Sequence, residues 1–439
     1  MRAAGLLGLV VAAGVALATT GGATDLRSVR APAAGIEAPS GALLAAAEFD
    51  GPARLMWVRP GTLRPELPPL RLDEDFVADF AVSPDGRRMA LGAEMRGRIQ
   101  LVDLRRLRTL GAVELPGPRP PAAGGASGLV WASPRRLLAL SGLAYGAPAT
   151  PVVVDPVRRR AVHEADWRGR PLQPHAAGER LVFLSAPQGG SAPGRARLVS
   201  YDQAGRLREL LLERIEAGTW RSGREPWQHV EPALAVSRSG RRAYVVSGDA
   251  RLVAEIDLRR WRVAYHEVTE PVSAMRRLLD LVEPPAHAKE PVDSQVRNAE
   301  VLPNGAIAVT GEDTRATDPP HVVPSTPFGV WLIDPRTWAL RPVDRDAQDF
   351  TVAGDRLLAR RWSIGGDGQR PIGVRAYDTA GARRWTRFED ADTIVRGAAG
   401  RYAYVEVKRA GRRRIHVLEL DSGRTVRTLP WRELRVLER

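Results

Sequence analysis

The sequence predicts an all-β fold built from repeated four-stranded antiparallel units, and three observations support this. An alternating apolar strand that ends in aspartate recurs along the chain, and a turn followed by a second apolar strand recurs upstream of it. Hydrophobic residues also make up 44% and charged residues 26% of the 439 residues, a composition typical of a globular protein. The chain can therefore bury a large core between repeated sheets.

The strand that ends in aspartate is the clearest repeat, with copies such as Ile99-Gln-Leu-Val-Asp103 and Val330-Trp-Leu-Ile-Asp334. An aspartate carboxylate at a strand end can accept hydrogen bonds from the backbone of the turn that follows. Seven aspartates occupy this position. We expect them to be structural turn residues: Asp103, Asp155, Asp202, Asp257, Asp334, Asp378 and Asp421.

The second repeat is a turn that precedes an apolar strand, as in Ser83-Pro-Asp-Gly86, Ser237-Arg-Ser-Gly240 and Pro303-Asn-Gly305. Asp-Gly and Asn-Gly between strands are hairpin signals. Each unit is therefore interpreted as strands A to D, with short A–B and C–D turns and a longer B–C loop. Repeated four-stranded units of this size are typical of the blades of a β-propeller.

These motifs resemble the WD40/YVTN-like β-propeller repeat superfamily. The resemblance rests on Ser83-Pro-Asp-Gly86 followed by arginine and an apolar strand, and then on a strand that ends in aspartate. It covers about residues 40 to 431, although the Trp-Asp dipeptide itself is missing. The resemblance implies a β-propeller and leaves the function open, because propellers host many chemistries and many scaffolds.

We predict eight blades, with seven as the alternative. The N-terminal unit, Gly41 to Leu72, offers strands at Leu43–Glu48, Arg54–Val58 and Leu63–Leu70 but lacks a good strand A, which Leu434–Leu437 can supply to close the ring. With seven blades, this unit is an N-terminal extension. The seven complete units start near Phe80, Gly128, His175, Pro232, Ala299, Asp349 and Thr393.

The termini and insertions complete the domain organisation. Residues 1–23 combine an arginine, an apolar run and small residues, which predicts a signal peptide or an uncleaved N-terminal anchor. Residues 24–40 are a predicted flexible tether, and residues 41–439 form a single propeller with a helical or loop insertion at 267–297. The protein is therefore expected to be secreted or extracytoplasmic, and monomeric. The absence of cysteine excludes disulfides and thiol chemistry.

The meander topology gives the ring two different faces. The A–B and C–D turns lie on one face, which we name the turn face, and the B–C loops and D–A connections lie on the other, the loop face. The net charge of +14 comes almost entirely from arginine, since only Lys289 and Lys408 are lysines. Many arginines follow the turns, among them Arg87, Arg88, Arg105, Arg106, Arg241, Arg242, Arg259 and Arg260.

Four acids near the starts of strands A form the one constellation that suggests chemistry: Asp79, Glu231, Glu300 and Asp349. A ring of carboxylates at the axis is a possible site for a divalent cation, and lactone-hydrolysing propellers are similar in using an axial acidic site. Solvation by channel water is the alternative. Trp220, Trp227 and His229 precede Glu231 and are a candidate aromatic wall beside the channel mouth, or packing under a loop.

The leading functional hypothesis is a non-catalytic extracytoplasmic propeller that binds a protein, glycan or cell-envelope component through its loop face, where long Gly/Pro-rich loops are predicted, among them Arg214–Val230. The first alternative is a metal-dependent lactonase or other hydrolase that uses the axial carboxylates. The second is binding of an anionic polymer by the turn face, without sequence-specific recognition of nucleic acid. No cofactor is expected apart from a divalent cation, and no catalytic residues are assigned.

Overall fold

The computed structural model describes most of residues 42–437. The predicted signal peptide and tether, and the predicted helix at Val272–Glu283, lie outside the described residues. Among the residues that are described, no helix has the length and apolar character needed to cross a membrane. The described ranges are 42–48, 51–72, 77–93, 97–116, 125–142, 148–167, 169–222, 227–269, 294–314, 326–361, 371–430 and 434–437.

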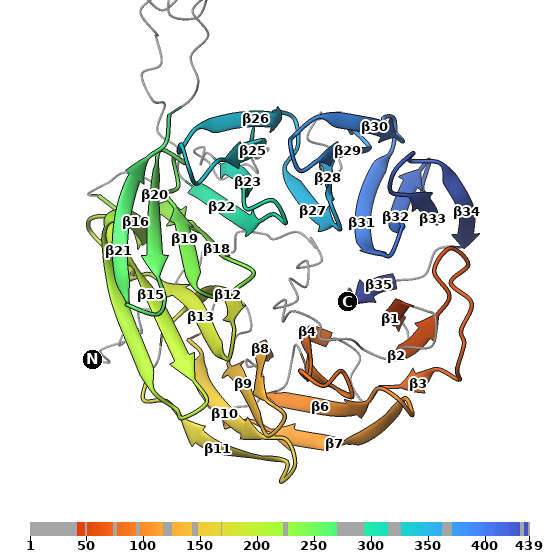
Figure 1. The fold of residues 1–439 in the computed structure, drawn as a ribbon, viewed down its shortest axis with the longest axis horizontal. Coiled ribbons are helices and arrows are strands. Elements are labelled where there is room, and N and C mark those ends of the chain that lie inside the picture. The colour runs from red at the N-terminus through yellow and green to blue at the C-terminus, as the bar shows by residue number, and fades with distance from the viewer. Residues whose placement is uncertain are drawn as a thin grey trace, which may run out of the picture.

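The regular elements in these ranges are all β-strands, and the sheets are arranged radially around a common centre (Figure 1). Most neighbouring strands pair antiparallel, and six separate sheets have four strands each. The molecule is therefore an all-β propeller with four-stranded antiparallel blades, as the repeats predicted. The six sheets are β1 (Ala42–Glu48), β2 (Gly51–Val58) and β3 (Leu70–Arg71) with β35 (Leu434–Leu437); β4 (Val77–Val82), β5 (Arg88–Ala93), β6 (Arg98–Asp103) and β7 (Arg108–Glu114); β8 (Ala126–Ser133), β9 (Arg136–Ser141), β10 (Thr150–Asp155) and β11 (Arg160–Glu164); β18 (Ala233–Val236), β19 (Arg242–Val246), β20 (Leu252–Asp257) and β21 (Arg262–Glu267); β27 (Asp349–Ala353), β28 (Arg356–Arg360), β29 (Val374–Asp378) and β30 (Arg383–Arg387); β31 (Asp392–Ala399), β32 (Tyr402–Arg409), β33 (Arg412–Glu419) and β34 (Thr425–Pro430).

A seventh, eleven-stranded sheet contains two more four-stranded antiparallel units that a short strand joins. That strand, β17 (Gln228–Glu231), pairs antiparallel with β16 (Leu207–Trp220) and parallel with β22 (Ser294–Val301). Two short strands, β14 (Gln188–Gly190) and β24 (Thr326–Pro327), pair with β16 and with β23 (Ile307–Thr314), respectively. The two units are β12 (Pro171–Ala177), β13 (Arg180–Ser185), β15 (Gly194–Asp202) and β16 (Leu207–Trp220), and β22 (Ser294–Val301), β23 (Ile307–Thr314), β25 (Val330–Ile333) and β26 (Leu340–Asp344).

Two local predictions are wrong. The segment Arg214–Val230 is largely strand rather than loop, because the chain continues to bury Ile215 and Ala217 in the core and so prolongs β16. The predicted strand Leu63–Leu70 shrinks to Leu70–Arg71, because residues 59–64 form a turn and the prolines that follow lack amide donors for a ladder.

The two ends of the chain share one sheet. β35 pairs antiparallel with β1, from Leu43 opposite Leu437 to Ala46 opposite Leu434, and lies nearer the centre of the ring than β1 (Figure 1). This pairing confirms the prediction that Leu434–Leu437 completes the N-terminal unit.

The core lies between neighbouring sheets. Leu55 and Trp57 of β2, for example, pack with Phe80 and Met89 of the next sheet. Tryptophan indoles add hydrogen bonds across these boundaries, since the Trp57 Nε1–H donates to the Leu104 carbonyl at 3.0 Å and the Trp131 Nε1–H donates to the Ala81 carbonyl at 3.0 Å. Each blade is therefore stabilised mainly by its neighbours.

Candidate functional site

The turn aspartates organise the turn face through backbone hydrogen bonds. Asp257 Oδ1 accepts hydrogen bonds from the amides of Arg259 and Arg260, both at 2.9 Å. The Arg260 amide is the main reason why the pKa of Asp257 lies below its usual value. Asp421 differs, because its carboxylate accepts a hydrogen bond from Arg356 Nη2 at 2.9 Å. Five other turn aspartates accept hydrogen bonds from backbone amides as Asp257 does: Asp103, Asp155, Asp202, Asp334 and Asp378.

Hydrogen bonds join some of the turns to one another, both within a blade and between blades. Within one blade, the Leu258 amide of a C–D turn donates to the Arg241 carbonyl of the A–B turn at 2.9 Å, and Leu104 and Arg87 make the same bond in another blade. Between blades, Arg180 Nη1 donates to the Leu258 carbonyl at 3.2 Å. The turn face is therefore a fixed surface rather than a set of independent hairpins.

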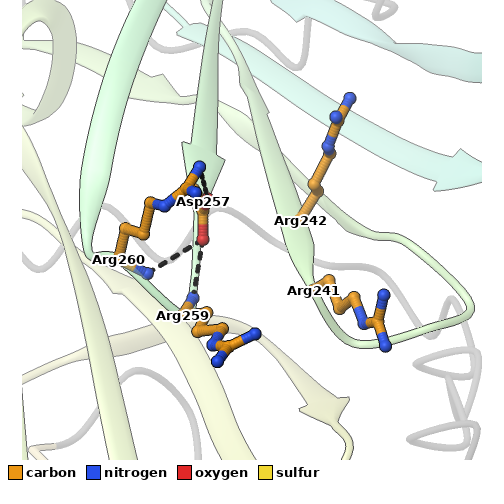
Figure 2. Close-up of a pocket in the computed structure, with 5 residues that line it drawn as sticks. All are labelled: Arg241, Arg242, Asp257, Arg259 and Arg260. Atoms are coloured by element: carbon orange, nitrogen blue, oxygen red, sulfur yellow. Dashed lines mark hydrogen bonds and ion pairs between the residues drawn. The ribbon is translucent and has the colours of Figure 1, made fainter.

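Two hollows of the turn face lie at equivalent places in two blades. The first has a volume of about 410 Å³, and Figure 2 shows arginines of the two turns on either side of it. The second has a volume of about 460 Å³ and lies at the turns of the β4–β7 sheet. Arg241, Arg242, Asp257, Arg259 and Arg260 line the first hollow, and Asp85, Arg87, Arg88, Asp103, Arg105, Arg106 and Leu110 line the second.

Many other arginines near the turns are neutralised by a nearby carboxylate. Arg206 lies 2.9 Å from Asp202, and Arg384 lies 2.7 Å from Asp378. Exposed pairs of this kind add little stability, but they cancel local charge. The side chains of Arg241 and Arg259 differ, because they contact no carboxylate among the described residues. These two side chains therefore contribute positive charge to the first hollow.

The axial acids are placed separately. Asp79, in β4, is only 4% exposed. Its Oδ1 accepts a hydrogen bond from the Phe80 amide at 2.7 Å, and its Oδ2 accepts one from the Leu129 amide of the next sheet at 2.9 Å. Burial raises the pKa of Asp79 to about 7, against the lowering effect of these amides and that of Gly128. The carboxyl group thus joins two successive inner strands.

Asp349 holds a buried cation. Its Oδ1 accepts a hydrogen bond from the Phe350 amide at 2.8 Å, which repeats the arrangement at Asp79, and its Oδ2 lies 2.7 Å from Nη2 of Arg360. Arg360 is fully buried, so the ion pair offsets the cost of removing the guanidinium from water. Asp349 is therefore engaged within its own blade.

Glu231 and His229 lie together on β17. His229 Nε2 is 3.6 Å from Glu231 Oε2, and His229 Nδ1 is 2.9 Å from the hydroxyl of Thr219 on β16. Trp220 ends β16 and is buried, whereas Trp227 lies directly before β17 and is 41% exposed. Only part of the predicted aromatic wall is thus open to solvent. Glu300 lies on β22, opposite Ala308.

The contacts described above do not bring the carboxylate groups of the four axial acids together at one point. Within the described ranges, no group of three or more His, Cys, Asp or Glu side chains is arranged to hold a metal ion. Asp79 and Asp349 instead use both carboxylate oxygens in hydrogen bonds with the protein.

Two inner residues, Gln173 and Arg297, make contacts that were not predicted from the sequence. Gln173 in β12 accepts a hydrogen bond from the Leu234 amide at 2.7 Å and donates one to the Arg297 carbonyl at 2.6 Å, so it joins three blades. Arg297 is 1% exposed, pairs with Asp313 at 2.6 Å and lies 4.0 Å from the ring centroid of Phe328. Neither residue belongs to a repeat, so only the three-dimensional arrangement identifies them.

Comparison with known proteins supports the fold. No protein-family model matches the chain, and no curated protein matches it. Among solved structures, it is similar to the dihydro-heme d1 dehydrogenase NirN in complex with DHE, with a TM-score of 0.56, 14% identity, and coverage of 93% of this chain and 76% of that chain. It is also similar to a putative dipeptidyl aminopeptidase IV from Bacteroides ovatus, with a TM-score of 0.51, 9% identity, and coverage of 90% and 59%.

A third similar structure is the β-propeller domain of Myceliophteria thermophila Cps50 (Swd1), with a TM-score of 0.37, 12% identity, and coverage of 82% of this chain and 88% of that chain. At such identities, similarity concerns the fold alone. The β-propeller resemblance is confirmed at that level.

Proposed function

We propose that this β-propeller is an exported, non-catalytic binding module that holds a protein or glycan of the cell envelope on its loop face. The observation that carries the proposal is Trp227, a large aromatic side chain that is 41% exposed beside a strand that crosses between blades. Trp is enriched among the residues that dominate binding energy, because its ring supplies a large and rigid contact surface. Export by residues 1–23 is part of the proposal.

The strand platform supports this role for the loop face. Because β17 pairs with both β16 and β22, the backbone next to Trp227 is hydrogen-bonded on two sides. The bond between Thr219 and His229 adds a side-chain link between β16 and β17. A binding residue that is held in place loses little conformational entropy when a partner docks.

We also propose that the ring has eight blades rather than seven. Six four-stranded sheets and the two four-stranded units of the eleven-stranded sheet support this number. So does the core, since the described residues form eight clusters, each shared by two successive units, the last of which joins Tyr404 of β32 to Met56 of β2.

The hydrogen bonds of the axial acids favour a binding module over the hydrolase alternative. A divalent cation needs carboxylate oxygens that converge on one point. Asp79 Oδ2 is directed to the Leu129 amide, and Asp349 Oδ2 to Arg360, so a cation would have to replace these bonds. A structural role explains both acids without a ligand.

The test compares Trp227→Ala with Val157→Ala, because Val157 is 64% exposed on a C–D turn and therefore on the turn face. On an array of bacterial cell-envelope glycans, we expect Trp227→Ala to weaken the binding of a captured glycan by about tenfold or more and Val157→Ala to leave it unchanged.

A protein partner is tested with a photo-crosslinking amino acid at position 227 or 157 in cells. Adducts formed from position 227 alone support the proposal. Failure to bind any glycan together with no adduct from position 227, or equal adducts from both positions, would contradict it.

A further inference from the structure

The two hollows of the turn face have the same construction. In both, a Gly-Arg-Arg sequence of the A–B turn faces an Asp-Leu-Arg-Arg sequence of the C–D turn. The two turns are tied by one backbone hydrogen bond, from Leu258 to Arg241 in the first hollow and from Leu104 to Arg87 in the second. Four arginines thus surround each hollow on a rigid frame.

The aspartate of the first hollow is occupied by backbone amides, and the second hollow contains one more aspartate, Asp85. Asp257 Oδ1 accepts hydrogen bonds from the amides of Arg259 and Arg260, while its Oδ2 lies 3.7 Å from Arg260 Nη1. This carboxylate therefore positions the turn and neutralises at most one guanidinium. Arg242 is paired with Glu255 at 2.8 Å, so its charge is offset as well.

Arg241 and Arg259 remain as uncompensated cations at the first hollow, with no carboxylate partner among the described residues. They belong to two different turns that face each other across the hollow (Figure 2). The planar guanidinium donates parallel hydrogen bonds that match the oxygen atoms of phosphate and sulfate. Two such groups at the lining of one hollow can hold one tetrahedral oxyanion.

We infer that each hollow binds a phosphate or sulfate group of a linear polyanion, with Arg241 and Arg259 as the principal contacts in the first. The hollow in the β4–β7 sheet supplies a second contact on the same face, through the arginines that line it: Arg87, Arg88, Arg105 and Arg106. One chain that occupies both hollows gains avidity, because the second contact forms within the complex. This site is independent of the loop-face proposal, so either can fail alone.

The experiment measures the affinity of the full chain for long-chain inorganic polyphosphate and for heparin at ~0.15 M salt, where non-specific contacts are already weak. The test variant is Arg241→Gln/Arg259→Gln. The control, Arg206→Gln/Arg384→Gln, removes the same formal charge near the turns but takes arginines already paired with Asp202 and Asp378. Circular dichroism checks that both variants are folded.

We expect the test variant to bind about tenfold or more weakly and to reduce the salt-dependence slope by about 2, which corresponds to two lost contacts. The control is expected to lose far less affinity. Binding of polyphosphate but not heparin assigns a phosphate polymer, and the reverse assigns a sulfated one.

Three results would overturn the inference. The first is equal loss of affinity in the test and control variants, which would mean that only net charge matters. The second is the absence of binding to either polymer at ~0.15 M salt. The third is preferential binding to anionic phospholipid vesicles, which would assign the turn face to a membrane surface.

Discussion

Asp79 is a carboxyl group surrounded by backbone amides at the junction of two inner strands. Its partners, Phe80 and Leu129, lie in different blades, so the side chain acts as a link between blades. β5 and β8 approach closely here, since a Cβ at Gly92 of β5 would lie 2.1 Å from the Ala126 carbonyl oxygen of β8. Burial in this junction raises the pKa of Asp79 to about 7.

This raised pKa makes a pH-dependent contribution to stability. Asp79 titrates near 3.8 when unfolded and near 7 when folded, so between these values only the folded protein holds the proton. The contribution is therefore fully present below about pH 4 and is lost as the pH rises to 7, with a total on the order of a few kcal/mol. We expect wild type to lose stability relative to Asp79→Asn as the pH rises from 5 to 8, because the amide stays neutral while the buried carboxyl group of wild type becomes ionised.

Thermal melts of both proteins from pH 5 to pH 8 measure this difference. Asp355→Asn is the control, because the Asp355 side chain is 72% exposed in a surface pair, and this variant should follow the wild type at every pH. A difference between Asp79→Asn and wild type that stays constant over the pH range would show that Asp79 does not titrate there.

At the scale of elements, two strands join units that are separated in the sequence. β35 joins the end of the chain to β1, and β17 joins the β12–β16 unit to β22. The first could be predicted from sequence, because the N-terminal unit lacked a strand A and Leu434–Leu437 was apolar. The second could not be, because Gln228–Glu231 is short and polar and its parallel partner, β22, is distant in sequence.

Removal of β35 tests how the ring is closed. Deletion of residues 434–439 should expose the edge of β1 and the clusters beside it, lower the melting temperature and promote aggregation, since an unpaired edge strand readily pairs with other chains. Deletion of residues 438–439 alone is the control and should melt like the wild type. Equal melting temperatures for the two truncated proteins would argue against closure by β35.

At the scale of the whole molecule, the ring of blades could be predicted from the sequence. The hydrogen-bond partners of the inner acids could not. The turn motifs and strand-end aspartates are local signals, so they predicted the blades, the turns and the arginine-rich face. The partners of Asp79, Asp349 and Gln173 come from other strands, and in part from other blades, so spacing along the chain does not reveal them. The axial position of an acid therefore does not by itself indicate a metal site.

On the two faces of the ring, the pairing and the exposure of individual side chains are likewise known only from the structure. The turn arginines are visible in the sequence, but only the structure distinguishes Arg241 and Arg259 from paired arginines such as Arg206. In the same way, only the structure separates exposed Trp227 from buried Trp220. We propose that these surface residues bind partners and that the inner carboxylates have a structural role.

The most direct test of this account is the melting temperature with and without calcium or manganese. A cation bound only by the folded protein raises the melting temperature in proportion to its affinity. We expect equal melting temperatures with and without either cation, in the wild type and in the Asp79→Asn/Glu231→Gln/Glu300→Gln variant. A rise in the wild type that this variant loses would contradict the account and establish an axial metal site.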